Sequence, residues 1–422
     1  MNLTEIRADF PILERRIGDR PLIYFDNAAT THKPRQVLET IQAFYTTYNA
    51  NIHRSPHRLG QEATELYDDA RRNVARFIGA EWPEEVIFVR GATEGINLVA
   101  YSLALGGSRR LRPGDEVVVT VMEHHSNLVI WQKVRDWCGV TLKVVDIQED
   151  GTLDMRQMRE AISARTRLVC CTHVSNVLGT INPVQEIGQL AHRAGALFLI
   201  DGAQSVPHLP VNVREIGCDF LAFSGHKMLA PMGIGALYGR RELLEEMSPF
   251  LYGGGMVVDV SLEEAFWNAL PWKFEGGTPN VCGAVALGGA TDRRTGRHLE
   301  GAVDYLTRLG MEAVRAHERA LTARALEGLR AIEGVRVYGP LDPERRSGVV
   351  AFSVAWSDAH LVAQLLNDEG IAVRSGEHCG FPLAERLAVE GTVRASFYVY
   401  NTMDEVERFI EALDDIVRYK LL

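Results

Sequence analysis

Ser224-Gly225-His226-Lys227 carries the strongest signal in this chain of 422 residues. It follows the apolar run Phe220-Leu221-Ala222-Phe223 and precedes a stretch that ends in Gly233-Ile234-Gly235. An apolar run bounded by glycines is typical of a buried strand that ends in a turn. A lysine amine in such a turn, once it is neutral, can form a Schiff base with an aldehyde. We therefore take Lys227 as a candidate catalytic residue.

A second strand end lies upstream of this lysine. Asp201-Gly202-Ala203-Gln204 follows the apolar run Ala196-Leu197-Phe198-Leu199-Ile200. Pyridoxal 5'-phosphate (PLP) requires a carboxylate at its ring nitrogen and an amine at its aldehyde. Asp201 and Lys227, at the ends of successive apolar runs, supply these two groups. The ordered pair predicts PLP as the cofactor.

The composition is that of a globular protein rather than of a membrane or nucleic-acid-binding protein. Hydrophobic residues make up 46% of the chain and charged residues 24%, and the net charge of −10 disfavours binding to phosphate backbones. No run approaches the roughly 18 apolar residues that span a bilayer, and residues 1–10 lack the apolar core of a signal peptide. The six cysteines form no Cys-x-x-Cys pair, so we expect no metal site and a cytoplasmic protein with free thiols.

The central part of the chain alternates short apolar runs with helical segments. This alternation predicts a mostly parallel sheet covered by helices on both faces. Ligands of such sheets bind beyond the carboxyl ends of the strands, where Asp201 and Lys227 are expected. The predicted strands are 116–120, 142–146, 167–173, 196–200, 220–223 and 234–238.

The pattern changes after Pro279. Residues 302–332 read as a long helix interrupted near Gly310, and shorter strands and helices follow. The strands are expected at 335–338, 349–354 and 372–374, and the helices at 357–368 and 403–417. We predict two domains: a large PLP-binding domain at 20–290, and a small α+β domain formed by 1–19 and 291–422.

Sequence blocks over nearly the whole chain resemble those of the class V, fold-type I PLP enzymes. They run from Tyr24-Phe25-Asp26-Asn27-Ala28-Ala29-Thr30-Thr31 to Arg394-Ala395-Ser396 and Tyr400-Asn401-Thr402. Within that family the chain resembles the group II (SufS-type) cysteine desulfurases. The resemblance implies an α/β fold-type I transferase with a seven-stranded, mostly parallel sheet and a smaller α+β C-terminal domain.

The resemblance also implies how the cofactor is held. Asp201 would keep the ring nitrogen protonated, and His124 would lie over the ring and assist proton transfer. The helix that opens at Gly91 would offer backbone amides to the phosphate. Thr278 matches the residue that family members donate to the neighbouring subunit, which implies a homodimer. The expected cofactor-binding residues are Thr93, His124, Asn176, Asp201, Gln204, Ser224, His226, Lys227 and Thr278.

The choice of reaction depends on the block Arg374-Ser375-Gly376-Glu377-His378-Cys379-Gly380-Phe381-Pro382. A thiolate at Cys379 could attack the sulfur of a bound cysteine, which requires an accessible thiol of low pKa. The family usually has two histidines before this cysteine, and here Glu377 replaces the first. The block is short, as in group II, so an acceptor protein would have to come to the thiol.

The substrate contacts complete the expected site. Arg394 matches the position that binds the substrate α-carboxylate, and its planar fork suits that group. The other expected substrate-binding residues are Asn27, Ala28, Asn176 and Arg374.

Three hypotheses on function follow. The first is a PLP-dependent cysteine desulfurase that moves sulfur from L-cysteine to Cys379 as a persulfide and releases L-alanine. It would supply iron–sulfur cluster or thio-cofactor assembly, with L-selenocysteine as a second substrate. The second is a selenocysteine lyase or another class V aminotransferase or lyase in which Cys379 is idle. The third is a non-catalytic scaffold, which the retention of Lys227, Asp201, His124, Cys379 and Arg394 disfavours.

Overall fold

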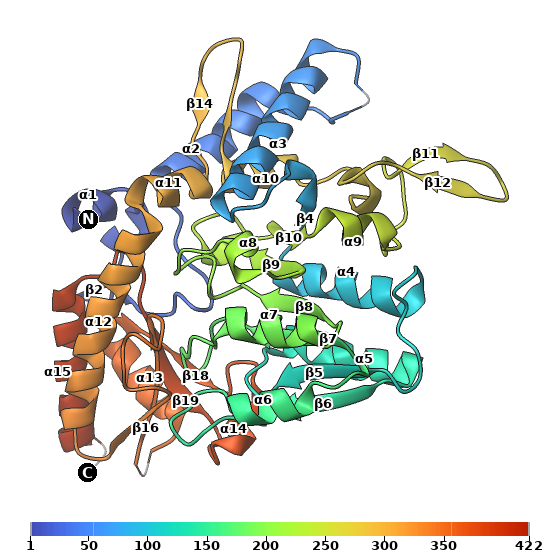
Figure 1. Ribbon diagram of the computed structural model, residues 1–422. Helices are drawn as coiled ribbons and strands as arrows, with labels where there is room; N and C mark the ends of the chain where they lie inside the picture. Colours follow the sequence, from blue (N-terminus) through green and yellow to red (C-terminus); the bar gives the residue numbers. More distant parts are fainter. Residues whose placement is uncertain (1, 54, 356, 421–422) are drawn as a thin grey trace.

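The computed structural model describes residues 2–53, 55–355 and 357–420. Figure 1 shows a large sheet with helices around it, and the C-terminal elements packed beside it. The large sheet has the strand order β4-β10-β9-β8-β7-β5-β6, in which only β10 runs antiparallel to its neighbours. Its strands are β4 (Val86–Val89), β5 (Glu116–Thr120), β6 (Thr141–Val145), β7 (Thr166–Thr172), β8 (Leu197–Asp201), β9 (Phe220–Ser224) and β10 (Gly235–Gly239).

The predicted strands of this sheet are confirmed to within one residue at each end. The exception is β4, which was not among the predicted strands. A four-residue apolar run such as Val86-Ile87-Phe88-Val89 cannot be distinguished from a buried piece of helix by periodicity alone. The fold class, an α/β protein built on a seven-stranded and mostly parallel sheet, is confirmed.

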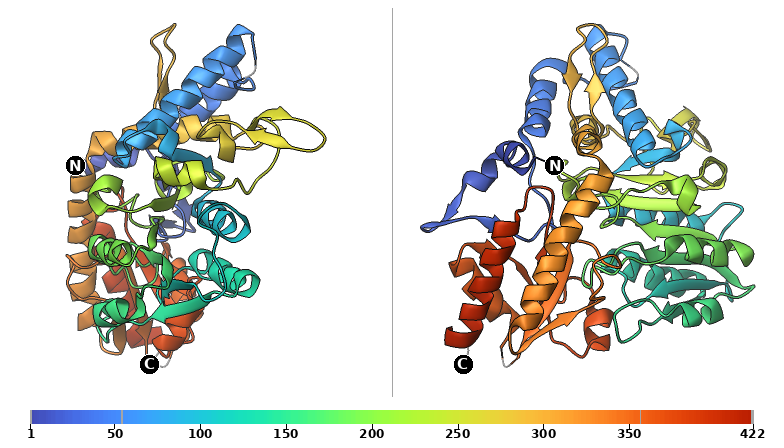
Figure 2. Two further views of the ribbon diagram at one scale, coloured as in Figure 1. Left: turned by 45° about the vertical axis from the view of Figure 1, so that its right-hand side comes forward. Right: turned by 60° about the vertical axis from the view of Figure 1, so that its left-hand side comes forward.

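Both faces of the sheet are buried, as its apolar strands require. In β5, Val117 and Val119 pack in the core beneath α4 (Ala92–Leu105) and α5 (Val129–Cys138), whereas Val118 packs on the opposite side. That opposite side is covered by helices such as α7 (Val184–Arg193). The two-residue alternation of strand side chains produces this division. Figure 2 shows α4 and α5 on one side of the sheet and α7 on the other.

The C-terminal elements form a second, antiparallel sheet with the order β15-β16-β19-β18. The helix break expected near Gly310 is confirmed, because α11 ends one residue before it and Gly310 takes a φ of 80°. The strands are β15 (Val335–Tyr338), β16 (Val349–Val354), β18 (Arg374–Gly376) and β19 (Thr392–Ser396), and the helices are α11 (Ala302–Leu309), α12 (Met311–Ala331), α13 (Ala359–Asp368), α14 (Phe381–Arg386) and α15 (Met403–Lys420).

The strand expected at 372–374 is divided in two. Its first part, β17 (Ile371–Ala372), pairs in parallel with β3 (Ile23–Tyr24), and its second part is β18, which pairs with β19. Phe25 then packs against Phe397 and Phe409 in the core of the C-terminal elements. The pairing therefore brings the N-terminal block to the C-terminal sheet.

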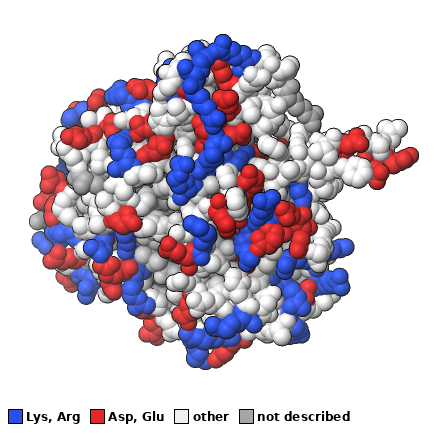
Figure 3. All heavy atoms as spheres, turned by 45° about the horizontal axis from the view of Figure 1, so that its top comes forward, with Lys and Arg blue, Asp and Glu red and all other residues white. Residues whose placement is uncertain are grey.

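The remaining elements include the fully buried helix α10 (Val281–Gly288) and one projecting hairpin. The hairpin of β11 (Val257–Val260) and β12 (Ala265–Trp267) projects from the body of the molecule (Figure 1). Figure 3 shows acidic side chains at the end of this projection, which carries Asp259, Glu263 and Glu264, and charges of both signs over the rest of the face. Among the described residues, no helix combines the length and apolarity that crossing a bilayer requires. The other elements are α1 (Leu3–Ala8), α2 (Arg35–Ala43), α3 (Arg58–Phe77), α6 (Met155–Ala161), α8 (Val213–Ile216), α9 (Arg241–Glu246), α10 (Val281–Gly288), β1 (Arg16–Ile17), β2 (Arg20–Pro21), β13 (Ala290–Thr291) and β14 (His298–Leu299).

Glu275 joins three separate parts of the large-sheet region. Its two carboxylate oxygens accept hydrogen bonds from both terminal nitrogens of Arg71, at 2.7 and 2.9 Å. They also accept the backbone N–H of Phe88 at 2.8 Å and the hydroxyl of Tyr67 at 2.9 Å. Both charged side chains are 4% exposed, so each depends on the other to remain buried. This bond network fixes the start of the segment that carries Thr278.

We predict that Glu275→Ala lowers the free energy of unfolding by about 3–5 kcal/mol, because it leaves the Arg71 cation buried without a counter-ion. Urea denaturation followed by circular dichroism measures the change. Glu263→Ala, an identical substitution on the exposed hairpin, is the control and should change stability by less than about 0.5 kcal/mol. Equal effects of the two substitutions would contradict the importance of the buried pair.

Candidate active site

A cavity of about 310 Å³ lies at the carboxyl ends of β7, β8 and β9, where the C-terminal sheet meets the large sheet. Most of the predicted site residues line it, although they come from elements spread over the whole chain. They are Ala28, Thr93, His124, Asn176, Asp201, Gln204, Ser224, His226, Lys227, Arg374, Cys379 and Arg394. The structure therefore brings the strand-end residues of the large sheet together with the block around Cys379.

Lys227 lies on the short 3-10 turn Gly225–Lys227 that follows β9. Desolvation in the cavity lowers the pKa of its amine from the ordinary 10.5 to about 8, and the positive charge of Arg394 adds to the shift. The carboxylate of Asp201 acts in the opposite direction. A pKa of about 8 leaves roughly a tenth of the amine neutral at pH 7, far more than for an ordinary lysine.

The peptide that precedes Lys227 is held by the N-terminal block. The carbonyl oxygen of His226 accepts hydrogen bonds from the backbone N–H of Thr31 at 3.0 Å and from the hydroxyls of Thr30 and Thr31 at 3.1 Å. The ammonium group of Lys33 donates to the same oxygen at 3.1 Å. These residues were not predicted to belong to the site. Their position indicates that the N-terminal block orients the lysine turn.

Asp201 ends β8 and is 3% exposed. One of its oxygens accepts the backbone N–H of Ala203 at 2.9 Å. Burial raises the pKa of its carboxyl group, and Lys227 opposes that rise. A cation in the cavity would stabilise a buried carboxylate with so few donors, and the protonated ring nitrogen of the expected cofactor would be such a cation.

A second carboxylate, Glu123, lies buried behind Asp201 and was not predicted to belong to the site. Burial raises its pKa to about 8, and the charge of Asp201 contributes to the rise. It accepts hydrogen bonds from the hydroxyl of Thr120 at 2.7 Å, the backbone N–H of Thr172 at 3.0 Å and the side-chain amide of Asn127 at 2.6 Å. It therefore fixes the strand ends around the cavity.

His124 and His226 face the cavity as neutral groups. Desolvation lowers the pKa of each imidazole to about 4, and the charge of Lys227 contributes in both cases. The Nδ1 of His124 accepts the backbone N–H of Ser126 at 3.2 Å and contacts its hydroxyl at 2.8 Å. His124 is thereby oriented by its own turn.

The start of α4 forms the end of the cavity that suits an anion. The hydroxyl oxygen of Ser224 accepts the backbone N–H of Ala92 at 2.9 Å, and the exposed Thr93 follows. A Cβ at Gly235 would lie 2.7 Å from Gly91 Cα and 2.4 Å from the carbonyl oxygen of Phe223, so β10 must carry glycine there. This close approach places an amide-rich helix N-terminus beside Ser224, an arrangement that binds phosphate.

Gln204 leaves a buried acceptor without a partner. Its side-chain nitrogen donates to the carbonyl of Ala28 at 2.7 Å, whereas its Oε1 is buried and has no hydrogen-bond partner among the described residues. A bound group with a polar edge would satisfy this atom.

Arg394, in the middle of β19, is held beside the cavity. Its Nη2 lies 3.2 Å from one carboxylate oxygen of Asp26, and the other oxygen of Asp26 lies 3.0 Å from Arg374. Its Nη1 donates to the carbonyl of Asn176 at 3.0 Å. Its Nε is buried and has no partner in the described chain. Burial lowers the pKa of the guanidinium. A carboxylate in the cavity would satisfy the free Nε.

Cys379 is the one exposed thiol among the cysteines, all of which are described. It lies at the rim of the cavity in a loop where His378 and Cys379 take φ values of 56° and 58°. Each left-handed residue other than glycine costs roughly 1–2 kcal/mol, so the loop must be held by its surroundings. The side-chain amide of Asn176 donates to the carbonyl of His378 at 2.7 Å, and the His378 ring lies 2.9 Å from the hydroxyl of Thr392.

The structure does not place Asn27 in the cavity. Its side chain is fully buried, and its amide nitrogen donates to the carbonyl of Ser396 at 2.7 Å and to Asn401 at 3.0 Å. Its oxygen accepts the hydroxyl of Tyr400. These bonds leave it no free group for a substrate, and its role is to hold the adjacent Ala28 against the wall of the cavity.

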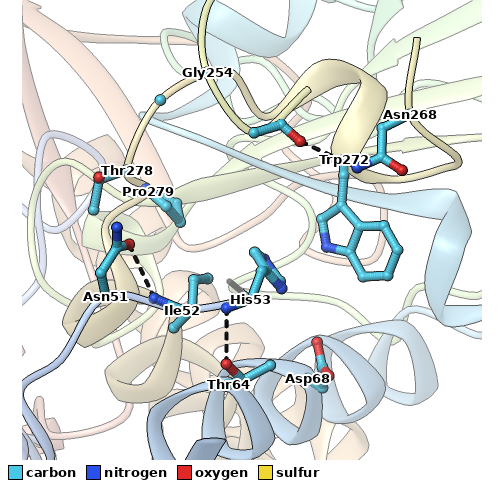
Figure 4. Close-up of a pocket in the computed structure, with 12 residues that line it drawn as sticks. Asn51, Ile52, His53, Thr64, Asp68, Gly254, Asn268, Trp272, Thr278 and Pro279 are labelled. Carbon is cyan, nitrogen blue, oxygen red and sulfur yellow. Dashed lines mark hydrogen bonds between the residues drawn. The ribbon is translucent and has the colours of Figure 1, made fainter. Parts of the chain in front are cut away.

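Thr278 also lies outside this cavity. It lines a separate one of about 620 Å³, which Figure 4 shows between the His53 region, Asp68 and the indole of Trp272. The Nε1 of Trp272 is buried without a partner in the described chain. Thr278 is exposed and does not line the cavity that the other predicted cofactor residues share.

Comparison with known proteins shows the family of the chain. The chain matches the family model described as Aminotransferase class-V over residues 23–409 and belongs to that family. It is 45% identical over 427 residues to a protein of Haloferax volcanii named cysteine desulfurase, with 98% of this chain and 96% of the relative covered.

Solved structures extend the comparison to the fold. The apo structure of a cysteine desulfurase from Thermococcus onnurineus NA1 aligns with a TM-score of 0.90 at 40% identity, over 98% of each chain. The cysteine desulfurase CsdA (S-sulfonic acid) from Escherichia coli aligns with a TM-score of 0.88 at 36% identity, over the full length of both chains. The fold-type I architecture expected from the sequence is confirmed.

We predict that the amine of Lys227 in the chain prepared without cofactor reacts with a small aldehyde with a midpoint at about pH 8. Only the neutral amine attacks a carbonyl, so the extent of reaction follows its titration. Borohydride trapping and peptide mass spectrometry at Lys227 measure the midpoint. Asp201→Asn should move it to lower pH, because the Asp201 carboxylate raises the pKa of the lysine. A midpoint near 10.5 would contradict the electrostatics described above.

Proposed function

We propose that this chain is a PLP-dependent cysteine desulfurase of the group II (SufS) type. The observation that carries the proposal is the exposed thiol of Cys379 at the rim of a cavity that also contains Lys227, Asp201 and Arg394. The first two residues suit PLP, the third suits an amino-acid carboxylate, and the thiol suits sulfur transfer. The names of the relatives support this combination.

The residues present fit PLP as the cofactor. Lys227 would hold its aldehyde carbon, Asp201 its ring nitrogen, and Thr93, Ser224 and the N-terminus of α4 its phosphate. His124 would lie at the ring, and the unpartnered Oε1 of Gln204 indicates that a polar edge completes the wall. When bound, PLP acts as an electron sink for the carbon atoms of an attached amino acid.

Arg394 would bind the carboxylate of L-cysteine through its free Nε. Arg374 shares Asp26 with Arg394, so the two cations lie close together and attract an anion to the mouth of the cavity. Ala28 and Asn176 form the adjacent wall, and each is held by hydrogen bonds through its backbone or side chain. The substrate would thus be oriented at its carboxylate, leaving its sulfur free to face Cys379.

Sulfur transfer follows from this orientation. The thiolate of Cys379 attacks the sulfur of the substrate, an S–S bond forms and the C–S bond of the substrate breaks. The electron pair of the broken bond remains on carbon, which takes up a proton and leaves as L-alanine. Cys379 retains the sulfur as a persulfide. L-selenocysteine presents the same geometry with a weaker bond to carbon and is proposed as a second substrate.

The Cys379 block supports the group II assignment. Only one residue separates Cys379 from the start of α14 at Phe381, so the thiol cannot travel far. A sulfur-acceptor protein would therefore dock at the exposed rim and carry the sulfur to iron–sulfur cluster or thio-cofactor assembly. A reducing compartment such as the cytoplasm suits an exposed nucleophilic thiol.

We also propose a homodimer and the division into domains at 20–290 and at 1–19 with 291–422. Thr278 would reach the phosphate in the partner's cavity, because it is exposed and lies outside the cavity of its own chain's cofactor residues. The cavity shown in Figure 4 would then lie on the face that meets the second copy.

Replacing Cys379 by serine should abolish release of sulfide from L-cysteine while the purified protein keeps the yellow colour of lysine-bound PLP. The hydroxyl cannot accept sulfur, and the cofactor contacts are unchanged. Cys138→Ser, which alters a buried thiol far from the cavity, is the control and should remain active. Sulfide release by the Cys379→Ser variant would favour another class V activity in which this thiol is idle.

For Arg394→Gln we expect the KM for L-cysteine to rise roughly 10- to 100-fold, the usual effect of losing a charged hydrogen bond. Arg386→Gln is the control, because Arg386 makes an exposed ion pair with Asp146 and does not line the cavity. Steady-state kinetics of alanine formation measures both variants. An unchanged KM in Arg394→Gln would exclude Arg394 as the carboxylate-binding group.

A further inference from the structure

The loop of Cys379 is bracketed by a residue to which neither the fold nor the proposed reaction assigns a role. The backbone N–H of His125 donates to the carbonyl oxygen of Cys379 at 3.0 Å. The imidazole Nε2 of the same residue accepts the backbone N–H of Phe381 at 3.1 Å. The His125 ring also packs on the Phe381 ring, with centroids 4.9 Å apart. One residue therefore binds the chain on both sides of Gly380.

These bonds act on a strained segment that has one backbone hydrogen bond of its own, from the N–H of Gly380 to the carbonyl of Glu377 at 3.0 Å. His378 and Cys379 are both left-handed, and Cys379 is exposed to solvent. Asn176 holds the carbonyl before Cys379, and His125 holds the carbonyl and the amide after it. Together with the contact of the His378 ring with Thr392, these anchors define the position of the thiol.

We propose that His125 is a positioning residue that fixes the Cys379 loop through its neutral imidazole. The adjacent His124 faces the cavity, so a single dipeptide sets the position of the nucleophile relative to the cofactor site. The consequence for sulfur transfer rests on the function proposed above, whereas the anchoring of the loop does not.

The anchor depends on the protonation of His125. Nε2 accepts the Phe381 N–H only in the neutral ring, because a protonated ring presents a hydrogen at that atom. Two charged or titratable groups act on His125. They are Glu377, in the Cys379 loop, and His124, which precedes His125 in the chain. Burial lowers the pKa of His125 and the carboxylate of Glu377 opposes that effect, so acid should release the loop and Glu377 should set where this occurs.

The test is hydrogen–deuterium exchange of the cofactor-loaded, full-length protein, followed at the peptide that contains Phe381. Three variants separate the two roles of the ring. His125→Gln keeps an acceptor, His125→Phe keeps only the aromatic packing, and His125→Ala keeps neither. We expect the Phe381 amide to exchange roughly three- to tenfold faster in the Phe and Ala variants, and within twofold of wild type in the Gln variant.

The pH dependence of protection at the Phe381 amide is a second measurement, and packing of the His125 ring alone would not change it. Protection of the Phe381 amide, corrected for intrinsic exchange, should fall in wild type as the pH drops below the ordinary histidine value of 6.5, and should stay constant in His125→Gln. Glu377→Gln should shift the fall to lower pH. If the Phe variant matches wild type and the Gln variant matches the Ala variant, the ring acts by packing and the inference is wrong.

Kinetics distinguish this inference from the proposed function. If both hold, His125→Phe lowers kcat for L-cysteine and changes its KM little, because Arg394 is untouched. If the exchange results are as expected and no wild-type activity with L-cysteine is found, the proposed function fails and the anchor stands. If wild type is active and exchange at Phe381 is the same in all the variants, the anchor fails and the proposed function stands.

Discussion

The electrostatic interaction of Lys227 with Asp201 in the cavity is the one on which the site depends. Removing two opposite charges from water costs free energy, and their attraction in a low-dielectric cavity offsets that cost only if the two groups are placed with precision. Parallel strands provide that placement, because β8 and β9 end at the same edge of the sheet and carry the two residues at their ends. Desolvation and Arg394 lower the pKa of the amine, and burial raises the pKa of the carboxyl group, which favours a cation beside it.

The rest of the chain serves to complete this cavity from outside the large sheet. The N-terminal block runs past the cavity, places Thr30 and Thr31 on the His226 carbonyl, and pairs with the C-terminal elements through β3 and β17. That pairing puts Asp26 between Arg374 and Arg394. Charges from both ends of the sequence are thereby balanced at one point, which explains why the cavity requires the whole chain.

Sequence alone predicted the parts of the site that follow from strand ends. Lys227 and Asp201 were identified because apolar runs mark buried strands and ligands bind where parallel strands end. Arg394 and Cys379 were identified only by family resemblance. The strand that contains Arg394, β19, is short and gives no clear strand pattern. Asn27 was placed in the cavity by its neighbours in the motif, whereas its amide is used within the core. Lys33 and His125 were missed because their partners are backbone atoms, which leave no mark in the sequence.

The central claim is that the thiol of Cys379 accepts sulfur from an amino acid held in the cavity of Lys227 and Asp201. The most direct measurement is mass spectrometry of the Cys379 peptide after the cofactor-loaded protein is incubated with L-cysteine, alkylated and digested without reductant. The account predicts a gain of one sulfur atom on the Cys379 peptide and none on the Cys138 peptide. Formation of L-alanine with no sulfur gained at Cys379 would contradict it.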